Sequence, residues 1–160
     1  MVEKTQALPA QVCKGLDGVI ADETRISEVD GQKCQLIYQG YPLDELVGKA
    51  TYEEVSYLLL HGALPTKPQL DAWEQQLRAG RALEAKEQAA LESLPPQGGP
   101  MAMLLTVISV LGLYDAEAEK GSVEVIRQEA IRTIAKTITI VAGIARRRAG
   151  APLLAPRPDL

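Results

Sequence analysis

Apolar residues recur at helical spacing through most of the chain from Pro42 onward, and this pattern predicts a succession of helices. The segment Thr51-Tyr-Glu-Glu54 is a capping box, which predicts the start of a helix that ends at Gly62. A second capping box, Thr66-Lys-Pro-Gln69, opens the next helix. A polar helix over about 82–93 follows, and two prolines end it.

Two later segments lack the polar stripe of a surface helix. Pro100–Leu113 is apolar on nearly every side, and Ser122 precedes a helix over about 123–149, on the order of 40 Å long. The middle of that helix, 134–145, contains one charged residue, Lys136. Such helices lie inside a core or between subunits, so both predict burial or pairing.

The N-terminal part predicts a small β-hairpin, because Asp30-Gly31 lies between two short runs within Arg25–Tyr38. An isolated ribbon is marginal in water, so we expect it to lie on the helical body. Residues 1–13 are expected to form an arm, 14–150 the helical unit and 151–160 a proline-rich tail without a helix. The fold class predicted is all-α with a small N-terminal hairpin.

Composition supports helices packed on helices. The chain has 160 residues, enough for one domain with a core. Hydrophobic residues make up 46%, but aromatic ones only 4%, with no Phe. The core must therefore consist of aliphatic side chains, whereas sheets are usually enriched in aromatic ones.

The formal charge of −4 gives no reason to expect nucleic acid or an acidic membrane as a partner. Residues 121–160 are nevertheless basic, with seven Lys and Arg against three Asp and Glu. Arg146, Arg147 and Arg148 favour a solvated helix end, and whether they bind an anion stays open. Two cysteines, Cys13 and Cys34, fit neither a disulfide framework nor a metal site. No apolar run approaches the ~20 residues of a membrane span, and no signal-peptide stretch is evident, so we expect a cytoplasmic protein.

No residue pattern predicts a catalytic, cofactor-binding or metal site. The chain has one histidine, His61, whose place at a helix end favours contact with the last carbonyls. Glu53 and Glu54 are accounted for by the helix start. Gly98-Gly99-Pro100 has neither the lysine nor the spacing of a phosphate loop.

Several segments, in their order and spacing, resemble the N-terminal part of citrate synthases from about residue 14 to the end. The matching segments are Gly15-Leu-Asp-Gly-Val19, Glu23-Thr24, Ile26-Ser27, Asp30-Gly31, Tyr38-Gln-Gly-Tyr41, Leu43, Glu45-Leu46, Thr51–Val55, Leu58–Gly62, Leu64–Thr66, Pro100-Met101, Thr106, Ser109, Leu111-Gly112 and Ile134-Ala135-Lys136.

The resemblance implies a mostly helical large domain whose helices matching 100–113 and 123–149 join two subunits. We therefore expect a homodimer. Its predicted interface or core positions are Met101, Leu104, Ile108, Ile134, Ile138 and Val141.

The resemblance also implies what this chain lacks. Citrate synthases condense acetyl-CoA with oxaloacetate through an Asp and two His of the C-terminal half, beyond the point matching Leu160. The family's His-Pro-Met-Asp is here Gly99-Pro-Met-Ala102, and its Leu-Arg-Thr is Leu104-Leu105-Thr106. Chemistry that needs two positioned histidines is not expected from a chain with one.

Three hypotheses for function follow. The chain is an inactive citrate-synthase-like protein that dimerises or assembles, without a cofactor. Alternatively, it is a fragment or a split subunit of a citrate synthase that C-terminal sequence completes. For a split subunit, a second chain supplies that sequence. The third hypothesis is an unrelated helical interaction module.

Overall fold

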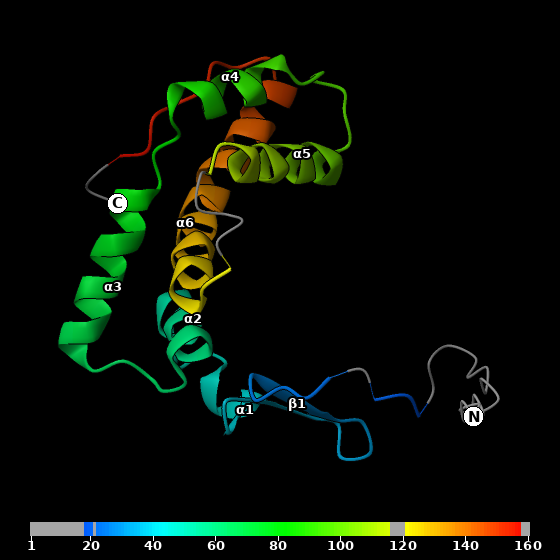
Figure 1. Ribbon diagram of the computed structural model, residues 1–160, viewed down its shortest axis with the longest axis vertical. Helices are drawn as coiled ribbons and strands as arrows, with labels where there is room; N and C mark the ends of the chain where they lie inside the picture. Colours follow the sequence, from blue (N-terminus) through cyan, green and yellow to red (C-terminus); the bar gives the residue numbers. More distant parts are fainter. Residues whose placement is uncertain (1–17, 21, 116–120, 158–160) are drawn as a thin grey trace, which may run out of the picture.

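The computed structural model describes residues 18–20, 22–115 and 121–157 and is mostly helical, with one small sheet (Figure 1). The predicted fold class, helices with a small N-terminal ribbon, is confirmed. The strands are β1 (Ser27–Asp30), β2 (Gln35–Tyr38) and β3 (Tyr41–Pro42), and the helices are α1 (Leu43–Leu46), α2 (Tyr52–His61), α3 (Lys67–Gly80), α4 (Ala85–Ser93), α5 (Pro100–Leu113) and α6 (Val123–Arg148).

The longest helix, α6, runs through the middle of the molecule, with α3 beside it and α5 across its C-terminal half (Figure 1). Two buried clusters lie along it. The first joins α4, α5 and α6 through Leu91, Met103, Val107, Ile140 and Ile144. The second joins α3 and α6 through Trp73, Leu77, Ile131 and Ala135. The absence of a polar stripe on α6 therefore reflects, in part, its contact with different helices along its length.

The predicted helix starts are confirmed by their hydrogen bonds. The Thr51 hydroxyl accepts from the Glu54 N–H at 3.2 Å, and the Glu54 carboxylate accepts from the Thr51 N–H at 2.7 Å. The Gln69 side chain accepts from the Thr66 N–H at 2.8 Å. Gly62 ends α2 at φ 84°, a left-handed conformation that glycine adopts without steric cost.

The N-terminal sheet has three antiparallel strands in the order β1-β2-β3. Asp30 organises the predicted turn, because its carboxylate accepts from the N–H groups of Gln32 and Lys33, both at 3.0 Å. The third strand, β3, was not expected from the sequence. It has two residues, too few to leave a period-two pattern.

Other differences from the predictions are small. The polar helix begins at Ala85 rather than near 82, because Glu84 is its N-cap. Residues 151–157 form neither helix nor strand, and no helix was expected there. The expected arm, 1–13, lies outside the described residues, and the proposed division into arm, unit and tail stays a prediction. Within the described part of the chain, no helix is long and apolar enough to cross a membrane.

Candidate functional site

Several large hydrophobic side chains lie exposed on α5 and α6, as others do elsewhere among the described residues. Met101 is 75% exposed, Ile138 51% and Val141 49%, although all three side chains are large and hydrophobic. Leu105 is 68% exposed on α5. Met101 and Val141 line one groove between the two helices.

The six predicted interface or core residues fall into two groups. Leu104 and Ile108 are half-buried against the cluster of α4, α5 and α6, and Ile134 packs against the cluster of α3 and α6. Met101, Ile138 and Val141 are exposed instead, so within this chain they are not core residues. Their role in an interface stays a prediction.

A shallow groove of about 250 Å³ separates the start of α5 from the end of α6. We call it the α5–α6 groove. Its lining residues are Pro100, Met101, Leu104, Val141, Ile144, Ala145 and Arg148. The single charged residue in that set makes the groove suited to aliphatic side chains rather than to a polar substrate.

The three consecutive arginines at the end of α6 hold neighbouring backbone segments in place. Arg148 is exposed, as expected for a solvated helix end, and Arg146 and Arg147 are half-buried. Arg146 Nε donates to the carbonyl of Pro152 at 2.5 Å, and Arg147 Nε to that of Leu94 at 2.6 Å. Arg148 donates to the carbonyl of Gly98 at 2.5 Å. They therefore fix the tail and the α4–α5 connection to α6 through charge-assisted hydrogen bonds.

The one charged residue in the apolar stretch of α6 forms a buried ion pair. Lys136 Nζ lies 2.5 and 2.6 Å from the two carboxylate oxygens of Glu87, and the side chains are 7% and 5% exposed. Glu87 Oε2 also accepts from the Glu84 N–H at 2.7 Å. The ion pair therefore connects α4 to α6. The Glu87 carboxylate also caps the start of α4.

His61 belongs to an aromatic cluster between α2 and α3 rather than capping the carbonyls of its own helix. Its ring stacks on Tyr57 with centroids 4.1 Å apart and meets the Trp73 ring edge-on at 5.8 Å. Trp73 Nε1 donates to the Ser56 hydroxyl at 3.1 Å. Burial, and secondarily the charge of Arg127, lowers the pKa of His61. These contacts give His61 a packing role.

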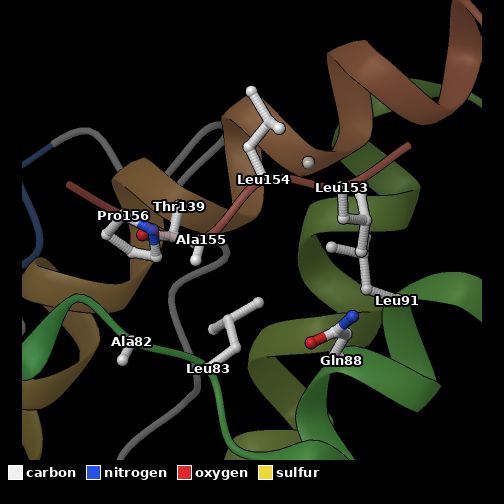
Figure 2. Close-up of a pocket in the computed structure, with 10 residues that line it drawn as sticks. Ala82, Leu83, Gln88, Leu91, Thr139, Leu153, Leu154, Ala155 and Pro156 are labelled. Carbon is white, nitrogen blue, oxygen red and sulfur yellow. The ribbon is translucent and has the colours of Figure 1, made fainter. Parts of the chain in front are cut away.

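A cavity of about 240 Å³ lies where the tail crosses α4 and α6. Figure 2 shows Leu153 beside Leu91 and Pro156 beside Thr139, with Leu83 and Gln88 on the opposite wall. The tail is anchored here, because Leu153 packs against the cluster around Leu91.

No metal site is evident among residues 18–20, 22–115 and 121–157, where no group of three or more His, Cys, Asp or Glu side chains is arranged to hold an ion. Cys34 is an exposed free thiol at the hairpin turn. Cys13 lies outside the described residues.

The described residues thus form helices packed along α6, with a small N-terminal sheet and an apolar groove between α5 and α6. The family model described as "Citrate synthase, C-terminal domain" matches residues 15–160. The chain belongs to the citrate synthase family.

Relatives and solved structures agree with this assignment. The chain is 38% identical over its full length to a citrate synthase of Mycolicibacterium smegmatis and covers 42% of that protein. It is 39% identical to a 2-methylcitrate synthase of Mycobacterium tuberculosis over 92% of this chain and 37% of that one. The crystal structure of citrate synthase from Pyrobaculum aerophilum superimposes with a TM-score of 0.85 at 33% identity, over 100% of this chain and 43% of that one. This chain thus spans about two fifths of the length of the curated relatives that it matches.

Sequence reasoning did not find the Glu87–Lys136 pair or the carbonyl contacts of the arginines. The signal for the pair was a lone lysine in an apolar stretch of α6. Its partner is 49 residues away, and local periodicity does not encode such a distance.

Proposed function

We propose that this chain is the assembly portion of a citrate-synthase-type protein, with α5 and α6 forming the seam of a homodimer. The observation that carries the proposal is the exposure of Met101 and Val141, which line the α5–α6 groove, and of Ile138, three residues before Val141 on α6. Burying apolar surface stabilises an association by roughly 25 cal/mol per Å² before entropy costs are subtracted. A second copy would cover the same residues on both partners, as a twofold interface requires.

We infer that the chain has no condensing activity by itself. Joining acetyl-CoA to oxaloacetate needs positioned acid and base groups, and the chain's one histidine is stacked on Tyr57. Two departures from the family pattern, Ala102 and Leu105, lie exposed on α5. An exposed leucine where the family commonly carries an arginine indicates contact with protein rather than with a charged substrate.

The oligomeric state tests the seam. Light scattering is expected to give about twice the monomer mass for the unaltered chain. Ile138→Asp is expected to give a monomer, because burying an unpaired carboxylate costs several kcal/mol. Gln76→Asp, at an exposed position of α3, is the matched control and is expected to remain dimeric. A monomeric unaltered chain, or a folded Ile138→Asp variant with dimer mass, would contradict the proposal.

A second candidate function is supported by the extent of the family match: the chain is part of a catalyst completed by C-terminal sequence. Its test is release of free CoA from acetyl-CoA and oxaloacetate. The chain alone is expected to give none, and addition of the unmatched C-terminal part of the Mycolicibacterium smegmatis relative is expected to restore turnover. A mixture that forms a stable complex without turnover favours the inactive assembly protein. Turnover by a mass-verified sample of the chain alone contradicts both.

A further inference from the structure

We propose that the cavity between the C-terminal tail and α4 binds a small neutral molecule with an aliphatic body and one hydrogen-bond donor, an alcohol or an amide. This is the cavity of about 240 Å³ drawn in Figure 2, and we call it the tail cavity. Its walls come from the α3–α4 connection, α4, α6 and the tail. None of its described lining residues carries a charge, so none of them would compensate the lost hydration of an ion.

Most of the wall of the tail cavity is aliphatic. Leu91 is fully buried, and Leu83 and Leu153 are half-buried against the same cluster. The tail is held in place here, because Arg146 Nε donates to the Pro152 carbonyl. The other apolar lining residues are Ala82, Gly143, Leu154, Ala155 and Pro156. An aliphatic ligand that covers them gains roughly 25 cal/mol per Å² of apolar surface removed from water.

The volume of the tail cavity sets the size of the ligand. An apolar cavity of roughly 150 Å³ takes up one benzene molecule. A cavity of about 240 Å³ therefore has room for a body of about six to ten non-hydrogen atoms. This lies below the roughly 300–1,000 Å³ of drug-sized ligand pockets, so a small metabolite-sized molecule fits better than a large cofactor.

Two polar side chains line the tail cavity among the described residues, and both offer acceptors. Gln88 Nε2 donates to Glu92 Oε1 at 2.9 Å. The Thr139 hydroxyl donates its hydrogen to the Arg81 carbonyl at 2.8 Å, so Thr139 Oγ1 is left to accept. Figure 2 shows the Gln88 oxygen on the side of Leu83, away from its amide nitrogen. A ligand O–H or N–H can donate to either oxygen, whereas an ether of the same size has no hydrogen to donate.

Titration of the ¹⁵N-labelled chain, followed by NMR of the backbone amides, tests the site with four probes of similar size. Hexan-1-ol and pentanamide each carry a donor, 1-methoxypentane is an isomer of the alcohol without one, and hexanoate carries a charge. At least one donor is expected to bind with a Kd below about 1 mM. The ether and the anion are expected to bind about fivefold more weakly or worse. The shifted amides should lie in segments 82–91, 139–143 and 153–156.

Three variants locate the contacts. Gln88→Leu removes one acceptor at an exposed position, and it is expected to weaken donor binding about fivefold without weakening the ether. Gln76→Leu, an exposed position of α3 outside the cavity lining, is the matched control and is expected to keep full affinity. Ala82→Leu fills part of the cavity and is expected to weaken the donor and the ether alike, by about tenfold.

The proposal is overturned by any of four results: neither donor binds below about 1 mM, the ether binds as tightly as the donors, Gln76→Leu loses as much affinity as Gln88→Leu, or the shifted amides lie outside the three segments. The described lining residues of the tail cavity are all different from those of the α5–α6 groove. A monomeric chain that binds the alcohol would therefore contradict the seam and support the site, and a dimer that binds neither donor would do the reverse.

Discussion

Individual side chains in this protein show how a charge is accommodated inside an apolar helix. Lys136 is buried on α6, and a lone ammonium there would lose its hydration without compensation. Both carboxylate oxygens of Glu87 provide that compensation. The pair therefore adds a polar contact to the apolar packing of Leu91 between α4 and α6.

Removing one partner of this pair is expected to cost far more than removing both charges. Lys136→Met leaves the Glu87 carboxylate buried without a cation, and we expect a loss of about 3–5 kcal/mol in the free energy of unfolding. The double variant Lys136→Met/Glu87→Gln has no buried charge and keeps an acceptor for the Glu84 N–H, so it should recover most of that loss. Urea unfolding measures both, and equal stability of the single variant and the unaltered chain would rule out the buried pair.

The aromatic cluster around His61 makes stability depend on pH in a defined direction. Burial and Arg127 lower the pKa of His61 in the folded state, so the folded chain binds fewer protons than the unfolded chain. The stabilisation is complete above the unfolded pKa of about 6.5 and is lost as the pH falls from there through the lowered pKa. His61→Phe keeps a stacked ring without titrating. Between about pH 7.5 and 5.5 the unaltered chain should therefore lose more stability to urea than this variant. Identical pH profiles would show that His61 does not titrate differently on folding.

At the scale of helices, two glycines allow neighbouring segments to pack closely against α6. A Cβ at Gly143 would lie 2.6 Å from Leu91 Cδ2 and 3.4 Å from Leu153 Cδ2. A Cβ at Gly80 would lie 2.9 Å from the Ala135 Cβ. Gly143 thus allows α4 and the tail to approach α6 closely, and Gly80 allows the end of α3 to do so.

Two glycine substitutions inside helices are expected to have opposite effects. Gly143→Ala should destabilise the chain by about 1–3 kcal/mol, because the new Cβ would force the fully buried Leu91 side chain to shift. Gly112→Ala in α5 meets no atom within 4 Å and should stabilise by up to about 1 kcal/mol through helix propensity. Thermal unfolding of both variants measures these changes in stability. A stabilised Gly143→Ala variant would contradict the close approach of α6 to Leu91.

For the whole molecule, the proposed seam of α5 and α6 predicts that stability depends on association. Only folded chains would associate through these residues. The melting temperature of the protein is therefore expected to rise with protein concentration. We expect this rise for the unaltered chain over about a hundredfold range of concentration, and none for Ile138→Asp. Calorimetry at several concentrations measures it. A melting temperature independent of concentration in the unaltered chain would count against the seam.

The sequence alone determined the order of the helices, their capped starts, the turn at Asp30-Gly31 and the aliphatic core. These features depend on residues within a few positions of one another, where spacing and backbone preference act directly. It also indicated that α5 and α6 lack polar faces. Periodicity could not separate burial within the chain from exposure on its surface, because both produce the same apolar pattern.

Only the tertiary structure made that separation. It buried Ile140 and Ile144 against α4 and α5 while leaving Ile138 and Val141 on the surface of the same helix. It also paired Lys136 with Glu87 and brought Gln88, Thr139 and Leu153 to one cavity. These contacts join residues far apart along the chain, so they depend on the packing of whole helices against α6 rather than on any local pattern.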